Sequence, residues 1–198
     1  MPQPPGAAGA VPPPLDPRYA AQLDAVLADP LAPATTDVGD ERGWLVARGV
    51  ARLVEPFVTA RPSDDADLAR FAGVSGASAI ALLERLDERH LADRQNAGPS
   101  LGTVVRAAAA HPDELEVHGY VVGPGRRDER LTAEGVDVYG LPLLDVRPDH
   151  DGQCQCELLW DGVVEHLGVD DAVTGPHEIT RRINPWRPNE TCWRLWWD

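Results

Sequence analysis

The sequence predicts an α+β fold, in which a helical N-terminal part packs on a small, antiparallel, β-rich C-terminal part. Up to about residue 112, apolar residues recur with the 3.6-residue period of amphipathic helices. From about residue 113 the apolar segments become short, β-branched or aromatic, and partly alternating. Turn sequences rich in Gly, Asp, Asn and Pro separate these later segments, which is typical of hairpins.

The 198-residue chain is long enough for one ordinary domain or two small ones, and we divide it into four regions. Residues 1–14 contain six prolines and little to bury, so they predict a disordered Pro/Ala/Gly tail. We expect a helix and a linker over 15–39, a helical domain over 40–112, and a β-rich domain over 113–198. The last region is acidic, with 18 carboxylates against 8 arginines, and supplies most of the net charge of −14.

The composition excludes several classes of chemistry. All 18 basic residues are arginine, so a Schiff-base lysine, a phosphate-binding loop with its lysine and an S-x-x-K acylation motif are all impossible. Three cysteines cannot make a closed disulfide framework. No apolar run is long enough to span a bilayer, and no secretion signal opens the chain. We expect a soluble, cytoplasmic protein from a GC-rich bacterium.

Within the helical region, the apolar stripe from Trp44 to Val58 predicts a helix that Pro56 kinks or ends. In the β-rich region, alternation predicts strands over 115–123, 135–146, 153–160, 163–169 and 191–197.

Two of these expected strands carry side chains of interest. On the first, Glu116, His118 and Tyr120 would share one face, which is either a site on a sheet or the solvated side of an edge hairpin. On the last, alternation places two groups on opposite faces. One group is Trp193, Leu195 and Trp197, and the other is Cys192, Arg194 and Trp196. A strand with apolar residues on both faces is either central in its sheet or covered by a partner.

Residues 64–94 resemble the helix-turn-helix family, and in particular its winged-helix branch. The matching positions are Leu68-Ala69, Gly73-Val74-Ser75, Ala79 and Leu82. The resemblance implies a DNA-binding transcriptional regulator. Its contacts would come from Ser75, Ser78, Arg85, Arg89 and Arg94.

The side chains available in this segment disfavour nucleic acid. At the start of the expected second helix only serine hydroxyls could reach base edges, where DNA-reading helices usually offer Arg, Lys, Asn or Gln. Residues 64–94 also contain seven carboxylates against four arginines, which weakens binding to phosphates. The sequence 73–77 has the spacing of a nucleophile elbow, but a position between two helices would be the wrong context for one.

The C-terminal sequence favours a protein partner. Four of the six tryptophans lie in residues 186–197, and Trp and Arg are enriched at binding hot spots. We therefore predict a non-catalytic protein-binding or regulatory protein without a cofactor. It would bind another protein or a second copy of itself, and would not bind a membrane. The candidate contact residues are Trp186, Arg187, Arg194 and Trp196.

A third hypothesis is a metal-dependent hydrolase centred on Asp149, His150 and Cys154. A zinc ion could be bound by His150, Cys154, Cys156 and Cys192, because two cysteines two residues apart on a strand would point to one face. The alternative is that the cysteines are small buried hydrophobes and the aspartates form turns. The usual paired C-x-x-C spacing is missing.

Overall fold

A computed structural model describes residues 17–198 apart from 30–33, 62–67, 124–125, 148–150 and 152. The tail expected at 1–14 lies outside these residues. Among the helices in the described part of the chain, none combines the length and the apolar character that crossing a bilayer requires.

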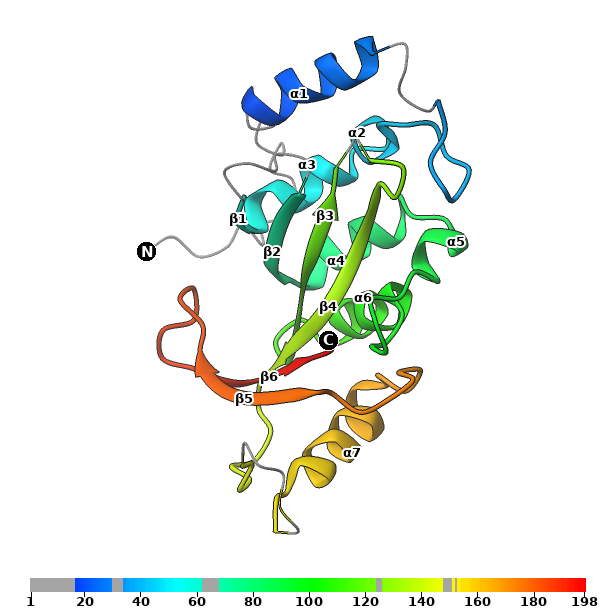
Figure 1. The fold of residues 1–198 in the computed structure, drawn as a ribbon. Coiled ribbons are helices and arrows are strands. Elements are labelled where there is room, and N and C mark those ends of the chain that lie inside the picture. The colour runs from blue at the N-terminus through cyan, green and yellow to red at the C-terminus, as the bar shows by residue number, and fades with distance from the viewer. Residues whose placement is uncertain (1–16, 30–33, 62–67, 124–125, 148–150, 152) are drawn as a thin grey trace.

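One six-stranded antiparallel sheet forms the centre of the fold, with strand order β1-β2-β3-β4-β6-β5 (Figure 1). Its two outer strands are β1 and β5. The strands are β1 (Val58–Ala60), β2 (Leu68–Val74), β3 (Leu115–Val122), β4 (Arg130–Val138), β5 (Glu178–Ile183) and β6 (Thr191–Trp196).

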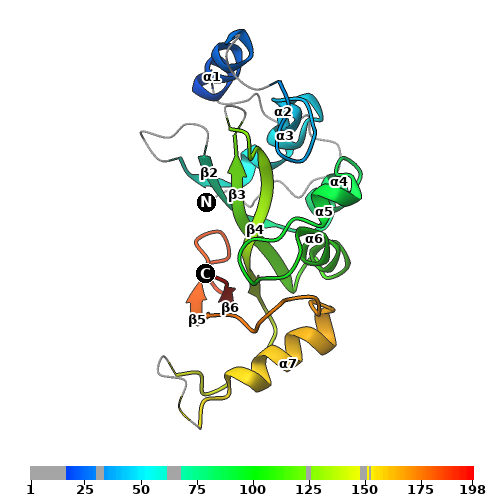
Figure 2. The same cartoon turned by 45° about the vertical axis from the view of Figure 1, so that its right-hand side comes forward.

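The described helices leave one face of β2, β3 and β4 uncovered. Helices α4, α5 and α6 lie together on the other face, whereas α1 lies at one end of the molecule and α7 at the opposite end (Figures 1 and 2). The helices are α1 (Pro17–Ala28), α2 (Trp44–Ala47), α3 (Val50–Val54), the 3-10 turn η1 (Glu55–Phe57), α4 (Gly76–Leu83), α5 (Glu88–Leu91), α6 (Leu101–Ala110) and α7 (Cys156–Leu167).

The hydrophobic core lies between the sheet and the helices. Alternate residues of the central strands point into it, among them Phe71, Val117, Val136 and Leu195, each at most 2% exposed. The expected mixture of helices and antiparallel strands is confirmed. So is the break of the Trp44–Val58 helix, since η1 contains Pro56. The sheet runs across the boundary expected near residue 112, because β2 pairs with β3.

Three predicted elements, one helix and two strands, are wrong. The first helix of the helix-turn-helix segment is strand β2, in which Ala69 and Phe71 are buried and the intervening Arg70 is exposed. The small residues of this segment fit both periods, and Gly73, with φ +93°, bends the strand where its register to β3 shifts. The two strands expected within 153–169 are instead the single helix α7. Strand β4 also ends at Val138, short of the expected residue 146.

The misreading of α7 has a simple cause. Asp161-Gly162 has the sequence of a hairpin turn, yet it lies inside the helix. Leu159, Val163 and Leu167 recur every four residues and are the buried stripe of α7, which ends at Gly168 in the left-handed conformation.

Close strand contacts make Gly135 of β4 a required glycine. A Cβ atom at this position would lie 2.2 Å from the carbonyl oxygen of Leu195 and 2.5 Å from the His118 ring. By contrast, a Cβ atom at Gly162 in α7 would have no neighbour within 4 Å.

We predict opposite effects for the same substitution at these two glycines. Gly135→Ala should lower the free energy of unfolding by about 1–3 kcal/mol, because the strand backbone must shift. Gly162→Ala should raise it by about 0.5–1 kcal/mol, because alanine restricts the unfolded chain and favours helix. Urea unfolding of both variants measures the difference. Equal effects of the same sign would contradict the packing described for β4 and β6.

Candidate functional site

The side of the sheet that the described helices leave uncovered carries a cluster of charged, aromatic and amide side chains, which we call the polar face. Its members come from β2, β3, β4 and β6, from Tyr139 after β4, and from the connection between β5 and β6. They are Arg70, Glu116, His118, Tyr120, Glu134, Asp137, Tyr139, Asn184, Trp186, Arg187, Arg194 and Trp196.

Strand β3 contributes the polar residues that the alternation predicted. Glu116, His118 and Tyr120 pair with Asp137, Gly135 and Thr132 of β4 and share one face. The edge-hairpin alternative is wrong, because β3 lies in the middle of the sheet and Glu116 and His118 are only 3% and 2% exposed. Buried charged groups at a sheet centre require partners of their own.

Asp137 of β4 is fully buried and is paired by groups from the C-terminal hairpin. Arg194, its cross-strand neighbour on β6, donates to both carboxylate oxygens at 2.8 and 2.9 Å, and Asn184 Nδ2 donates at 3.1 Å. Burial disfavours the Asp137 carboxylate, but these hydrogen bonds outweigh it and hold the pKa of Asp137 below its ordinary value. The pair therefore lies on the sheet as a fixed carboxylate–guanidinium unit.

Glu116 fixes the connection between β5 and β6 over the sheet. Trp186 Nε1 donates to it at 3.0 Å, the Arg187 guanidinium pairs with it at 2.9 Å, and the Tyr139 hydroxyl donates at 2.9 Å. The Trp186 ring also packs on β2, where a Cβ atom at Gly73 would lie 3.2 Å away. Burial and the Glu116 charge raise the pKa of Tyr139, so its phenol stays a donor.

Glu134 connects the remaining aromatic residues of the polar face. Trp196 Nε1 donates to it at 3.3 Å, and His118 Nδ1 lies 3.7 Å from it. Burial alone would raise the pKa of Glu134, but interactions with His118, Tyr120 and Trp196 lower it to about 2. Arg70 donates to the Tyr120 hydroxyl at 2.8 Å, which extends the cluster to β2.

His118 is the least satisfied member of the polar face. Neither ring nitrogen has a hydrogen-bond partner, although the ring is buried against Gly135. Burial lowers the pKa of His118, which favours the neutral imidazole.

The structure brings together all four of the predicted partner-binding residues. Trp186, Arg187, Arg194 and Trp196 each donate through a side-chain N–H to one of the three carboxylates Glu116, Glu134 and Asp137. Sequence reasoning missed the remaining members of the polar face, which are Arg70, Glu134, Asp137, Tyr139 and Asn184. The strand expected over 135–146 begins at Gly135, and Asp137 lies two residues later. The alternation could therefore have predicted the face of the sheet on which Asp137 lies. The position of Glu134 depends on the bulge in β4, and that of Asn184 depends on the β5–β6 connection. Neither feature has a recognisable local sequence pattern.

The predicted DNA-contact residues do not form a row of available cations. Arg89 pairs with Asp40 and Asp87, and Arg94 pairs with Asp171 at 3.3 Å. Arg85 donates to the carbonyl oxygen of Ala81. Ser78 is half-buried on α4. Such pairing lowers the positive potential that phosphate binding requires.

Ser75 lies between strand β2 and helix α4, so the two-helix context expected for residues 73–77 is wrong. A strand-to-helix junction is the context of a nucleophile elbow, but Ser75 has extended backbone at φ −156°. Its hydroxyl donates to the carbonyl oxygen of Pro112 at 3.1 Å. The hydroxyl is thus used to join this junction to the segment after α6.

Among the described residues, Cys154, Cys156 and Cys192 do not gather as a group of metal ligands. Cys156 begins α7, Cys154 contacts the backbone of Arg147 in the preceding loop, and Cys192 is buried on β6. Burial raises the pKa of Cys192 to about 11, which opposes the thiolate that zinc requires. Asp149 and His150, the other residues of the hydrolase hypothesis, lie outside the described residues.

Two cavities lie along the edge strand β5, apart from the four partner-binding candidates. One, of about 570 Å³, is lined by Leu144, Val146, Ile179 and Trp193 among others. The other, of about 320 Å³, includes Trp160 of α7. These cavities are the alternative place on the described surface where a partner could bind.

We predict that acid weakens the fold through Glu134. Because the folded-state pKa of Glu134 is about 2, its carboxylate contributes stability that is complete above the unfolded value near pH 4.5 and is lost as the pH falls toward 2. Glu134→Gln should therefore flatten the decline in unfolding free energy across this window. Urea unfolding between pH 6 and pH 2 tests this, and an identical slope in the variant would refute it.

We also predict that Arg194 is needed to compensate the negative charge of the buried Asp137 carboxylate. Arg194→Met should lower the free energy of unfolding by about 3 kcal/mol, because it leaves a buried carboxylate without its main partner. Adding Asp137→Asn should recover much of the loss. The matched control is Arg126→Met, since Arg126 pairs with Asp128 at the exposed β3–β4 turn and should cost less than about 1 kcal/mol. Equal losses at the two arginines would exclude this role.

In comparisons with protein-family models, curated proteins and solved structures, nothing matches this chain. The function proposed for this chain therefore rests on the arrangement of the residues in the polar face.

Proposed function

We propose that this chain is a non-catalytic protein-binding protein that contacts its partner through the polar face. One observation carries the proposal. Trp186, Arg187, Arg194 and Trp196 lie together on the side of the sheet that the described helices leave uncovered. Each is half-buried, with its donor groups fixed on the buried carboxylates Glu116 and Asp137 or on the half-buried carboxylate Glu134.

Fixed orientation favours binding, because long side chains that are already ordered lose little conformational entropy when a partner arrives. Trp and Arg are also the residues most enriched at binding hot spots. Cation–π contacts order two arginine side chains on this face. The Arg187 guanidinium lies 4.2 Å from the centre of the Tyr139 ring, and the Arg70 guanidinium lies 5.1 Å from the centre of the Tyr120 ring.

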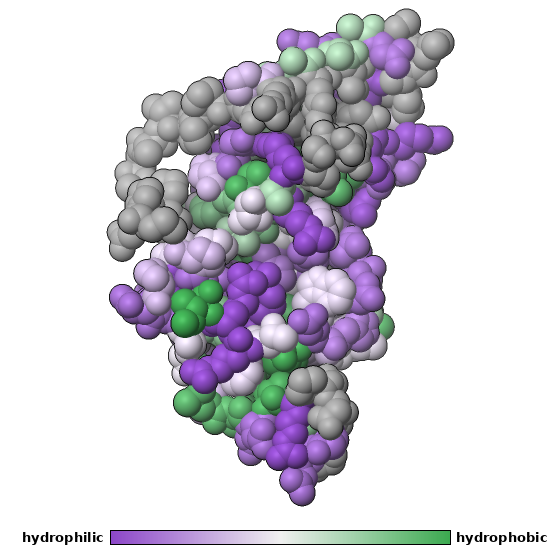
Figure 3. All heavy atoms as spheres, turned by 60° about the vertical axis from the view of Figure 1, so that its left-hand side comes forward, coloured by the Kyte–Doolittle hydropathy of each residue, from purple (hydrophilic) through white to green (hydrophobic). Residues whose placement is uncertain are grey.

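The surface composition fits a partner that binds and dissociates. Seen with the left-hand side of Figure 1 turned forward, most of the residues that are coloured in Figure 3 are hydrophilic, and hydrophobic residues form smaller patches among them. A non-obligate interface has about the same polarity as the rest of a protein surface. The pairing of Arg89 and Arg94 with carboxylates makes a protein a better candidate than nucleic acid.

The test is affinity capture from cells that express the chain naturally, with three immobilised baits: wild type, Trp196→Ala and Trp160→Ala. Trp160 is also half-buried but lies on α7, so it is a matched control. We expect a protein that wild type and Trp160→Ala recover equally and that Trp196→Ala recovers at least about tenfold less, since loss of a hot-spot tryptophan costs 2 kcal/mol or more. Circular dichroism of each bait checks that it is folded.

Three outcomes would count against the proposal. Equal recovery by all baits would place binding elsewhere, and selective loss with Trp160→Ala would move it to the cavity beside β5. If no protein is recovered above background, the only partner left to the proposal is a second copy of this chain. Sedimentation of wild type and Trp196→Ala measures that self-association. A wild-type monomer that captures no protein would refute the proposal.

A further inference from the structure

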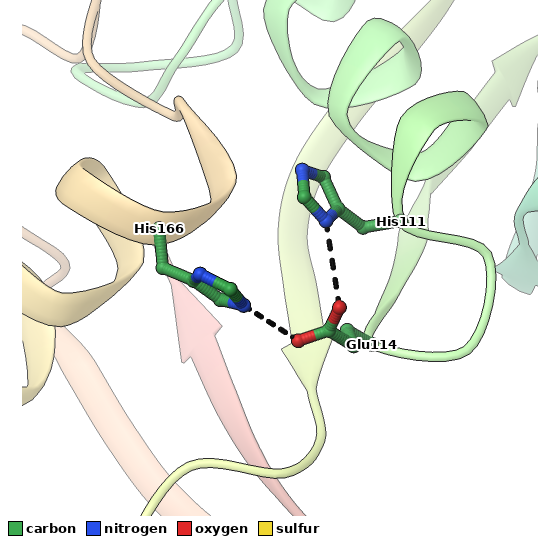
Figure 4. A group of neighbouring side chains, drawn as sticks. All are labelled: His111, Glu114 and His166. Carbon is green, nitrogen blue, oxygen red and sulfur yellow. Dashed lines mark hydrogen bonds and ion pairs between the residues drawn. The ribbon is translucent and has the colours of Figure 1, made fainter.

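Three potential metal ligands meet at the junction of α6, β3 and α7. His111 follows the last residue of α6, Glu114 immediately precedes β3, and His166 lies in the last turn of α7 (Figure 4). His166 and Glu114 are 52 residues apart in sequence. This convergence comes from the tertiary fold, and none of the three residues is a member of the polar face.

The ligand atoms have the spacing of a small coordination site. Glu114 Oε2 lies 2.7 Å from His166 Nε2, and Glu114 Oε1 lies 3.5 Å from His111 Nδ1. One ligand atom from each of the three residues lies within 4.8 Å of the other two. Four-coordinate zinc holds N and O ligands at about 2.0–2.1 Å, so neighbouring ligand atoms are about 3.3 Å apart.

The backbone on both sides of the group is well anchored. The amides of Glu114 and Leu115 both donate to the His111 carbonyl oxygen, and the amide of Tyr139 donates to that of Glu114. Helix α7 ends at the buried Leu167, directly after His166, and Gly168 is its C-cap. The side chains themselves are 28%, 41% and 57% exposed for His111, Glu114 and His166, so they can adjust and an ion can enter.

We propose that His111, Glu114 and His166 form a zinc site that tethers α7 to the α6–β3 junction. Two imidazoles and one carboxylate are a donor set that suits zinc, whereas magnesium and calcium prefer oxygen ligands. Three protein ligands on an exposed surface leave the fourth position to water.

The experiment is calorimetric titration of the metal-free full-length chain with zinc chloride at neutral pH, together with thermal unfolding with and without zinc. We expect one zinc ion per chain and a higher unfolding temperature when zinc is present, because a ligand that binds only the folded state stabilises it. His166→Gln and His111→Gln should each weaken binding at least about tenfold and remove the thermal shift.

Two variants are the matched controls. His177→Gln changes an exposed histidine outside the group, and Cys156→Ser removes a thiol at the other end of α7, so both should bind zinc like wild type. The proposal is overturned if wild type binds no zinc, if binding survives both His111→Gln and His166→Gln, or if Cys156→Ser abolishes it. If one histidine variant does not fold, the other decides.

Discussion

Three carboxylates of β3 and β4 add side-chain contacts to the β4–β6 pairing that joins the C-terminal hairpin to the sheet. Glu116, Glu134 and Asp137 lie on the polar face, where burial makes an uncompensated charge costly. Their donors come almost entirely from β6 and the β5–β6 connection, with Arg194 on Asp137 as the clearest case. The same donors supply the aromatic and guanidinium surface that we propose for binding, so stability and recognition depend on one set of contacts.

Where the chain alternates clearly, its sequence predicted the structure. The pattern in 191–197 placed Trp193 and Leu195 opposite Arg194 and Trp196, and β6 does bury the first pair in the core while the second lies on the polar face. Its apolar character on both sides predicted either a central strand or one covered by a partner, and β6 lies between β4 and β5. Partner-binding candidates chosen by residue type therefore came together in space, although their carboxylate partners were not recognised.

Other features could not be predicted, because local patterns were ambiguous or contacts were distant. Small residues in β2 fit a helical period as well as an alternating one, and Gly73 interrupts the alternation with a bulge. In α7 the turn-like Asp161-Gly162 hid a helical stripe. His111 and His166 had no sequence signal in common, since only the docking of α7 beside the end of α6 brings them to Glu114.

The most direct test of the central claim is hydrogen exchange of the tryptophan indole N–H groups, measured by NMR at neutral pH. Trp186 and Trp196 donate these protons to carboxylates, whereas Trp44, Trp193 and Trp197 donate theirs to backbone carbonyl oxygens. If Glu116 and Glu134 hold these indole rings in place, the Trp186 and Trp196 protons exchange far more slowly than those of free indole. Glu116→Gln then speeds the exchange of the Trp186 proton more than that of the Trp196 proton. Exchange of both protons at the free-indole rate would contradict the account.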